Sequence, residues 1–410
     1  MQRRRWLQWS TAAPLAASMP LFAAPATDKD QARFLLVFLR GAYDCANLLV
    51  PHASPFYYES RPNIAVAKPN ASDANAALEL DAQWALHPAL RDTMLPLWQQ
   101  GQLAFVPFAG TEDTSRSHFE TQDSIELGQP LQGTRDFQSG FLNRLAGVLG
   151  AAGSSRAIAF TDQLPLVFRG QPAVTNMALG SAGKPQVNNQ QAEVIRSMYA
   201  NTRLAGAVAG GFETRDEVMR SMESASSMGM GGMGEMEAAS RNAITTKGFE
   251  GEARRVARVM RERFRLGFID VGGWDTHVSQ GGATGTLATK LGELGRGLAG
   301  FAQEMGPAWQ HTVVVVMSEF GRTFRENGNR GTDHGHGSVF WVMGGAVNGG
   351  RIAGDQQEIA QATLFQNRDF PVLNEYRAVL GGLFARQYGL SATQVERVFA
   401  GARPRDLELI

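Results

Sequence analysis

The sequence predicts an α/β fold built on a mostly parallel sheet with helices on both faces. Short apolar runs alternate with helical patterns along the chain, as expected for parallel strands joined by helices. Val313–Met317 is an almost pure β-branched run and the strongest strand pattern in the chain. Arg33–Leu39 is a second apolar run and ends at Arg40 and Gly41. Apolar runs without alternation are typical of strands buried on both faces. The chain has 410 residues, of which 43% are hydrophobic, so it is able to form a large core.

The remaining elements follow from the same two patterns. Apolar side chains from Leu287 to Leu298 have helical spacing and lie on one face of a helix. A helix is also expected to begin after Ser117, because Ser117 and Glu120 have the spacing of a capping box. Further strands are expected at 103–108, 157–160, 266–271 and 339–343, and further helices at 90–97, 253–264 and 376–383.

The composition excludes several classes of protein. Lys and Arg number 39 and Asp and Glu also number 39, whereas a protein that binds nucleic acid through its phosphates carries a basic excess. We therefore expect no nucleic-acid partner. The one cysteine, Cys45, excludes an intramolecular disulfide and a cysteine-based zinc or iron–sulfur site. No histidine that could act as a base is evident near Cys45 in the sequence. This favours the interpretation of Cys45 as a small buried residue over that of a nucleophile.

Residues 1–26 are interpreted as a cleaved export signal. Arginines precede a weakly apolar run that ends in small residues, and Arg3-Arg4-x-Trp6-Leu7 is similar to the twin-arginine motif. A general secretion signal is the alternative. The twin-arginine translocase carries folded proteins, which suits a chain that takes up a metal before export. We expect a periplasmic or secreted protein in which residues 27–410 form a single domain, with no membrane span after cleavage.

One segment differs from the rest of the chain. Residues 219–239 are rich in Met, Gly and Ser. A flexible surface insertion is one interpretation, and a Met-rich metal site or a cap over the active site is the other. Thioether sulfur suits copper(I), but no His or Cys lies nearby to complete such a site.

Two glycine-rich motifs combine Asp with His. They are Gly272-Gly273-Trp274-Asp275-Thr276-His277, directly after a strand, and Gly331-Thr332-Asp333-His334-Gly335-His336-Gly337. Loops at the carboxyl ends of parallel strands are where α/β proteins place ligands, and carboxylate oxygen and imidazole nitrogen bind Zn²⁺, Mn²⁺ and similar ions. We expect the histidines to share one metal-bearing cleft with Asp44, which follows the first strand. For Asp44 the alternative is an ordinary turn residue, and for the motifs it is Asp–His hydrogen bonds that brace loops.

A nucleophile is expected at Ser117. A hydroxyl at a helix N-terminus has its alkoxide stabilised by free N–H groups, and Arg116 beside it is suited to clamp an anionic oxygen. A helix-capping role for Ser117 is compatible with this. Three roles stay open for His118: a base, a metal ligand or a packed core residue. Glu319 follows the strongest strand and is a candidate ligand, with Arg322 as a candidate anion contact; a buried Glu–Arg pair is the alternative.

These residues together resemble the domain-of-unknown-function 1501 (DUF1501) family of exported bacterial proteins. The family is similar to a remote branch of the alkaline phosphatase and sulfatase superfamily, which implies a three-layer α/β/α sandwich. It also implies one or two divalent metal ions (Zn, Mn, Mg or Ca) at the strand ends. The matching pieces run in order along nearly the whole mature chain: Arg40-Gly41-x-x-Asp44, Tyr57-Tyr58-x-x-Arg61-Pro62, Ser117-His118-Phe119-x-x-Gln122, Gly140-Phe141-Leu142-Asn143-Arg144, Gly273-Trp274-Asp275-Thr276-His277, Ser318-Glu319-Phe320-Gly321-Arg322-Thr323 and Asp333-His334-Gly335-His336-Gly337.

The resemblance also implies roles for individual residues. In the superfamily an Asp after the first strand binds metal, as Asp44 would, and a Ser, Thr or modified Cys at a helix start is the nucleophile, as Ser117 would be. This chain departs from the pattern where Glu319 and Phe320 replace a common Asp-His pair. Cys45 lacks the context for conversion to formylglycine, which disfavours an ordinary sulfatase. The residues that would complete the metal sites are Asp275, His277, Asp333, His334 and His336.

Two functions stay open. One is an exported metal-dependent hydrolase that acts on an anionic substrate, a phosphate or sulfate ester. The other is a non-catalytic periplasmic binding or assembly protein on the same fold, in which the metal is structural or absent.

Overall fold

The computed structural model describes residues 31–150, 156–179, 189–202, 204–206, 208–210, 212 and 239–410. The expected signal at 1–26 lies outside these described residues, and so does the Met-rich segment at 219–239 except for its last residue. Within the described part of the chain, no helix has the length and apolar character needed to cross a membrane.

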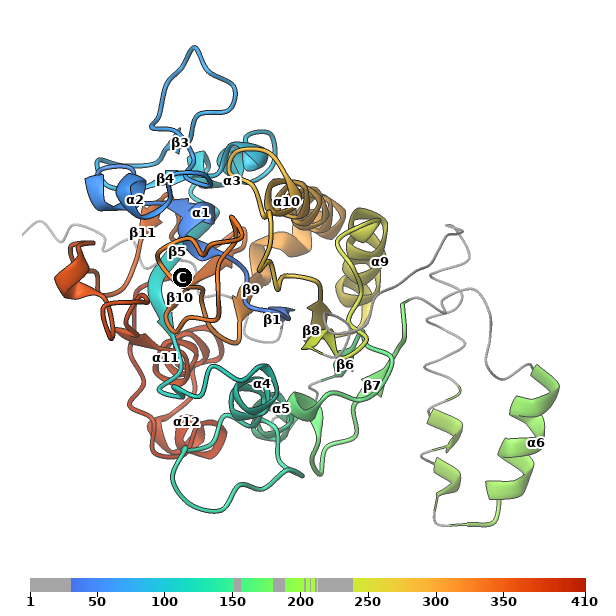
Figure 1. Ribbon diagram of the computed structural model, residues 1–410. Helices are drawn as coiled ribbons and strands as arrows, with labels where there is room; N and C mark the ends of the chain where they lie inside the picture. The colour runs from blue at the N-terminus through green and yellow to red at the C-terminus, as the bar shows by residue number, and fades with distance from the viewer. Residues whose placement is uncertain are drawn as a thin grey trace, which may run out of the picture.

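A nine-stranded sheet forms the centre of the fold, in the order β11-β5-β10-β9-β1-β8-β6-β7, with β12 also paired to β5 (Figure 1). The central strand β1 (Arg33–Leu39) runs parallel to both β8 (Leu266–Val271) and β9 (Thr312–Ser318). β10 (Ser338–Met343) runs antiparallel to both of its neighbours. The other strands are β5 (Leu103–Gly110), β6 (Ala157–Ala159), β7 (Thr175–Asn176), β11 (Arg351–Ile352) and β12 (Asn374–Glu375).

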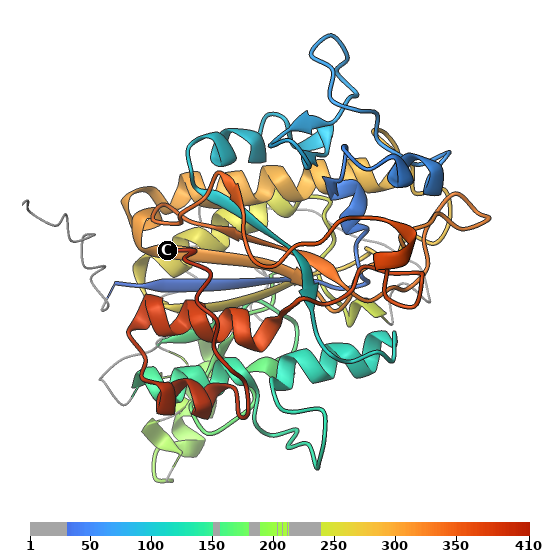
Figure 2. The same ribbon diagram turned by 90° about the vertical axis from the view of Figure 1, so that its left-hand side faces the viewer.

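Helices cover both faces of the sheet and complete a three-layer α/β/α sandwich (Figure 2). Side chains of β1 alternate between two hydrophobic clusters, as the period of two in a strand requires. Leu35, Val37 and Leu39 pack with one helical layer, and Phe34, Leu36 and Phe38 pack with the other. The first layer holds α3 (Met94–Gln99), α9 (Phe249–Glu262) and α10 (Thr286–Met305), and the second holds α4 (His118–Leu127), α5 (Phe141–Gly150), α11 (Tyr376–Tyr388) and α12 (Ala392–Val398). The predicted fold class is confirmed.

The part of the sequence between β1 and β5 forms smaller elements. β2 (Leu49–Val50), β4 (Ala85–Leu86) and β3 (Leu78–Glu79) form a separate antiparallel sheet. In the chain, α1 (Cys45–Leu48) precedes this sheet and α2 (Pro55–Ser60) lies between β2 and β3. A further helix, α6 (Asn189–Tyr199), follows β7. Cys45 is buried, which confirms it as a small buried residue, and burial raises the pKa of its thiol to about 12.

One predicted element is misplaced. The helix expected at 90–97 begins only at Met94, and residues 88–90 form a short 3₁₀ turn in its place. The imidazole of His87 accepts a hydrogen bond from the Ala89 backbone N–H at 3.1 Å and so holds this turn. Apolar spacing alone does not reveal such a side-chain-to-backbone bond, because it arises from a polar residue outside the pattern.

The strand ends that carry the predicted site residues meet at one edge of the sheet. β8 and β9 are parallel to β1, and β5 is antiparallel to β10, which is itself antiparallel to β9. β5 therefore runs in the same direction as β1, β8 and β9. The loops that follow these four strands open on the same side, where parallel sheets carry their ligand sites.

Candidate metal centre

Three side chains from three strand-end loops point at one another. Ligand atoms of His118, Asp275 and His334 all lie within 4.8 Å of one another. His334 Nε2 is 3.0 Å from His118 Nε2 and 3.3 Å from Asp275 Oδ1. His118 begins α4 after β5, Asp275 follows β8, and His334 lies between β9 and β10. The sheet topology brings these distant parts of the chain together.

A fourth side chain, His277, adjoins this group. Its Nε2 lies 3.1 Å from His334 Nε2 and 2.8 Å from Asp275 Oδ1. The His277 side chain is 37% exposed, whereas that of His118 is 8% exposed. We call His118, Asp275, His277 and His334 the histidine cluster; it runs from the protein interior at His118 to solvent at His277.

The other ring nitrogen of each histidine meets an oxygen that accepts hydrogen bonds. His118 Nδ1 lies 2.8 Å from Glu319 Oε1, and His277 Nδ1 lies 3.1 Å from Asp333 Oδ1. His334 Nδ1 lies 3.0 Å from the carbonyl oxygen of Arg116. A carbonyl or ionised carboxylate only accepts, so each Nδ1 carries a proton and each ring turns its Nε2 inward. Two Nε2 atoms that face each other beside the Asp275 carboxylate need a proton or a metal ion between them, because two lone pairs repel.

Glu319 holds His118 in place. This fully buried carboxylate also accepts hydrogen bonds from the Gly41 backbone N–H at 2.8 Å and from Gln122 Nε2 at 3.0 Å. Burial alone would raise the pKa of Glu319, but the hydrogen bond from His118 outweighs it and lowers the pKa to about 2. Arg40 Nη1 donates to the other end of the Gln122 amide, so a buried network continues from the cluster into the sheet.

Arg322 ties the loops of the cluster together. Its buried guanidinium donates to the carbonyl oxygens of Gly41 at 2.7 Å, Trp274 at 3.2 Å and Thr332 at 3.1 Å, and also to that of Ala42. It also donates to Asp275 Oδ1. Burial alone would raise the pKa of Asp275, but hydrogen bonds from His118 and His334, together with the Arg322 charge, hold it well below its usual range. Neither sequence-based alternative for Arg322 describes this arrangement, because its donors are taken up within the protein and its ion-pair partner is Asp275, not Glu319.

Two glycines allow the loops to approach this closely. Gly41 has a φ of +111°, and a Cβ there would lie 2.8 Å from the Asp275 backbone nitrogen. A Cβ at Gly335 would lie 2.4 Å from the Arg322 carbonyl carbon. Neither contact is possible for another residue without movement of the backbone.

Several predicted ligands lie outside the cluster. Glu319 and Asp333 contact the Nδ1 atoms of His118 and His277, so they orient these rings and do not point at the centre of the cluster. Asp44 forms a bidentate ion pair with Arg61, at 2.5 and 3.0 Å, and accepts a further bond from Gln280. Its oxygens are therefore satisfied by a guanidinium where we expected a metal.

The predicted ligand His336 also lies outside the cluster. The His336 ring packs against Phe365 at 4.7 Å between centroids, and burial with the nearby Arg116 charge lowers its pKa to about 4.

The predicted catalytic pair has mixed placement. Arg116 has a φ of +54°, and its guanidinium binds Asp369 Oδ2 at 2.6 and 2.9 Å and Gln366 at 2.7 Å. It is committed to these partners, and its contribution to the cluster is the carbonyl that orients His334. Ser117 occupies the residue before α4, but its side chain makes no capping hydrogen bond. The capping-box expectation for Ser117 and Glu120 is therefore wrong, and the nucleophile role of Ser117 stays a prediction.

His118 is the cluster residue that the sequence left unresolved among three roles. It occupies the same kind of position as Asp275, since it follows a strand whose carboxyl end lies at this edge of the sheet. Its neighbours in sequence are Ser, Arg and Phe, without the glycines that mark the other two motifs. His118 is identified as a site residue by its place at the start of the helix that follows β5. This place is informative only when the direction of β5 in the sheet is known.

We expect metal-free protein to lose stability as the pH rises from about 6.5 to about 9. Burial alone would lower the pKa of His118, but hydrogen bonds to Asp275 and Glu319 outweigh it and raise the pKa to about 9. A raised pKa stabilises the fold fully below the unfolded value near 6.5, and this stabilisation is lost as the pH passes about 9. The loss is on the order of 3 kcal/mol. Urea unfolding of chelator-treated protein at several pH values measures it.

Glu319→Gln serves as the control for this pH dependence. The substitution removes one of the two carboxylates that favour protonated His118, so the dependence between pH 6.5 and 9 should become clearly shallower. An unchanged slope in the Glu319→Gln protein would show that another group is responsible.

Comparisons with solved structures find distant likenesses. A protein in the alkaline phosphatase superfamily from Vibrio parahaemolyticus has a TM-score of 0.36 and 8% identity, over 76% of this chain and 60% of that chain. Ps i-CgsB has a TM-score of 0.38 and 9% identity over 91% and 75% of the two chains. The alkaline phosphatase from the Antarctic bacterium TAB5 has a TM-score of 0.30 and 9% identity over 76% and 90%. This chain thus spans less than two thirds of the Vibrio protein, and such low TM-scores transfer no residue roles.

The family comparison covers almost the whole described chain. No curated protein matches the sequence. The family model described as "Protein of unknown function (DUF1501)" matches residues 31–399, from just before β1 to just after α12. With nearly every structural element inside that match, the chain belongs to the DUF1501 family.

Proposed function

We propose that this protein is a metal-dependent hydrolase of anionic esters, in which His118, Asp275 and His334 hold a divalent cation and His277 adjoins them beside His334 and Asp275. The observation that carries the proposal is the arrangement of the imidazoles. Each ring commits its Nδ1–H to an acceptor and turns its Nε2 toward the Asp275 carboxylate or toward a neighbouring Nε2. Metal-binding histidines have this pattern of outer hydrogen bonds.

The donor set fits a borderline divalent ion. Imidazole nitrogens with one carboxylate oxygen suit Zn²⁺ or Mn²⁺, whereas Mg²⁺ and Ca²⁺ favour oxygen ligands. Atoms that lie about 2.0–2.1 Å from a tetrahedral ion are roughly 3.3 Å from one another. The distances of 3.0 Å between His118 and His334 and 3.3 Å between His334 and Asp275 are close to this value.

The residues around the cluster support ester hydrolysis. A bound divalent cation supplies Lewis acidity and lowers the pKa of a nearby hydroxyl or water. Ser117 directly precedes His118, so its hydroxyl is adjacent in sequence to a ligand of the site. The first N–H groups of α4 begin at the same point and favour a bound anion. The partly exposed side chain of Arg368, whose Nη2 donates to the His334 carbonyl at 2.8 Å, adds a positive charge there.

The alternative is a binding or assembly protein with a structural metal. One observation favours it: among the described residues, no imidazole or carboxylate hydrogen-bonds the Ser117 hydroxyl. A serine without a base or a metal is a weak nucleophile. Metal content tests the site shared by both functions, and turnover separates them.

The metal prediction concerns protein purified without chelator or added metal. We expect about one Zn²⁺ or Mn²⁺ per chain, bound by the cluster. His334→Ala should remove it, because His334 Nε2 contacts every other member of the cluster. Mass spectrometry of the metal content measures this. His336→Gln is the matched control and should retain the metal; equal loss in both variants would mean that the ligand set is wrong.

The catalytic prediction concerns Ser117→Ala in metal-loaded protein. With 4-nitrophenyl phosphate and 4-nitrophenyl sulfate as probes, turnover of the active ester should fall by at least about a thousandfold, as for other nucleophile deletions. Metal content and thermal stability should not change, because the Ser117 side chain caps nothing. Ser72→Ala, at an exposed serine whose hydroxyl donates to Asn70, is the matched control and should keep its turnover. Metal-loaded wild type that turns over neither ester would favour the non-catalytic alternative.

We also propose export through the twin-arginine translocase, supported by the order Arg3-Arg4-x-Trp6-Leu7. Replacing Arg3, Arg4 and Arg5 by Lys keeps the charge but removes the guanidinium pattern. The protein should then accumulate in the cytoplasm, as followed by immunoblot of cell fractions. Undiminished protein in the periplasm would indicate the general secretion route.

A further inference from the structure

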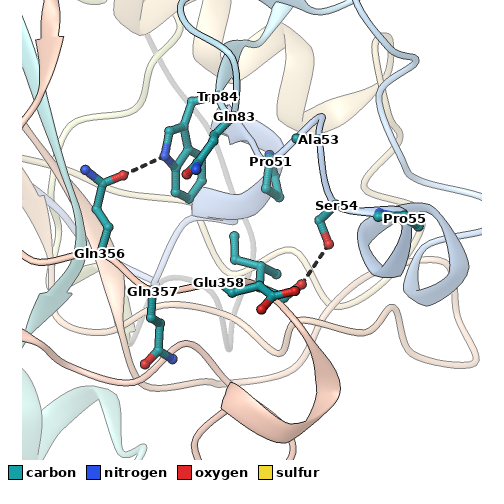
Figure 3. A pocket seen from close by; sticks show the side chains of 10 residues that line it. Pro51, Ala53, Ser54, Pro55, Gln83, Trp84, Gln356, Gln357 and Glu358 are labelled. Carbon is teal, nitrogen blue, oxygen red and sulfur yellow. Dashed lines mark hydrogen bonds between the residues drawn. The ribbon is translucent and has the colours of Figure 1, made fainter.

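A cavity of about 500 Å³ lies among three loops that contain no member of the histidine cluster (Figure 3). Its walls come from Pro51, Ala53, Ser54 and Pro55 before and at the start of α2, from residues 83 and 84 before β4, and from residues 356–359 after β11. This volume is in the range of sites that hold a small organic ligand. The cavity has no part in the metal site proposed above.

The walls of the cavity are held by internal hydrogen bonds. Ser54 Oγ donates to the Ile359 carbonyl at 2.8 Å, and the buried Trp84 donates from Nε1 to Gln356 Oε1 at 2.8 Å; both bonds are drawn in Figure 3. Pro51 and Pro55 add segments with a fixed φ. A ligand that enters such a preformed site pays little of the ordering entropy that weakens binding to mobile loops.

The cavity presents neutral groups that both donate and accept hydrogen bonds. The Gln356 amide nitrogen remains free to donate, because the bond from Trp84 uses only its oxygen. Gln357 Nε2 donates to the Thr363 carbonyl at 2.6 Å, which leaves its oxygen free to accept. The Gln83 amide has no side-chain partner among the described residues. Glu358 supplies the one ionisable side chain of the described wall, which contains no Lys, Arg or His.

We propose that this cavity binds an uncharged, polyhydroxylated ligand, a mono- or disaccharide unit. Each sugar hydroxyl both donates and accepts, which matches free amide groups. The rings of Pro51 and Pro55 and the side chain of Ile359 offer apolar surface to the C–H faces of such a ring. An anionic ligand would find no cation in the wall, and an apolar ligand would leave the amides without partners, at a cost in binding.

The test uses the metal-loaded mature protein and saturation-transfer NMR with neutral disaccharides: maltose, cellobiose and diacetylchitobiose. We expect at least one to bind with a dissociation constant that titration calorimetry or NMR measures. Gln83→Leu combined with Gln356→Leu should weaken that binding about tenfold, as expected for the loss of two hydrogen bonds. Gln99→Leu, an exposed glutamine at the end of α3, is the matched control and should bind like the wild type.

Three outcomes overturn the proposal. The first is that none of the three disaccharides binds, and the second is that the double variant binds with wild-type affinity. The third is that only spermidine binds and that Glu358→Gln removes this binding, which would assign a cation site. Thermal unfolding checks that each variant is folded. Gln83→Leu alone, at an exposed side chain, provides the test if the double variant does not fold, and should then weaken binding about threefold.

Discussion

The buried guanidinium of Arg322 is the interaction on which the candidate site depends. A cation without water must have its donors satisfied by the protein, and here the acceptors are backbone carbonyls and one carboxylate. Those carbonyls belong to the loop after β1, the loop after β8 and the segment before His334. Arg322 therefore fixes the relative positions of three loops from distant parts of the sequence. Loss of one partner of such a buried pair typically costs about 3–5 kcal/mol.

Two aspartates at this edge of the sheet have guanidinium partners, but only one retains spare oxygen capacity. Asp44 receives two bonds from Arg61 and one from Gln280, so both of its oxygens are engaged within a fully buried pair. Asp275 contacts Arg322 and His277 through Oδ1, while Oδ2 lies 3.6 Å from His118 Nε2. Its side chain is also partly exposed. Only Asp275 is therefore able to serve a cation in the cluster, although both residues follow strands in the same way.

This difference explains what the sequence was able to predict. β1, β8 and β9 are buried on both faces, so their continuous apolar runs identified them, and with them the places of Asp275 and His277. The direction of β10 was not readable, because an apolar run has the same pattern in a parallel or an antiparallel strand. The sequence also does not show which aspartate pairs with which arginine. The pairs Arg61–Asp44 and Arg322–Asp275 are far apart in sequence or separated by loops, and they form only in the folded chain. The sequence also predicted Glu319 and Asp333 as ligands. Residue type and strand position do not distinguish a ligand from a group that orients a ligand.

The acceptors behind the histidines also set the character of the site. Glu319 is held by Gly41 and Gln122, and Asp333 accepts a bond from Asn327 Nδ2 at 3.0 Å, so neither depends on a metal for its position. The ligand geometry is therefore built by the sheet and its loops before any cation arrives. In small zinc domains, by contrast, metal binding and folding are one event. A cation bound as proposed would lose little free energy to the ordering of its ligands, and it would displace the proton that the raised pKa of His118 retains near neutral pH. The metal affinity of the proposed site would then depend on competition between a proton and a metal ion for histidines whose positions are already fixed.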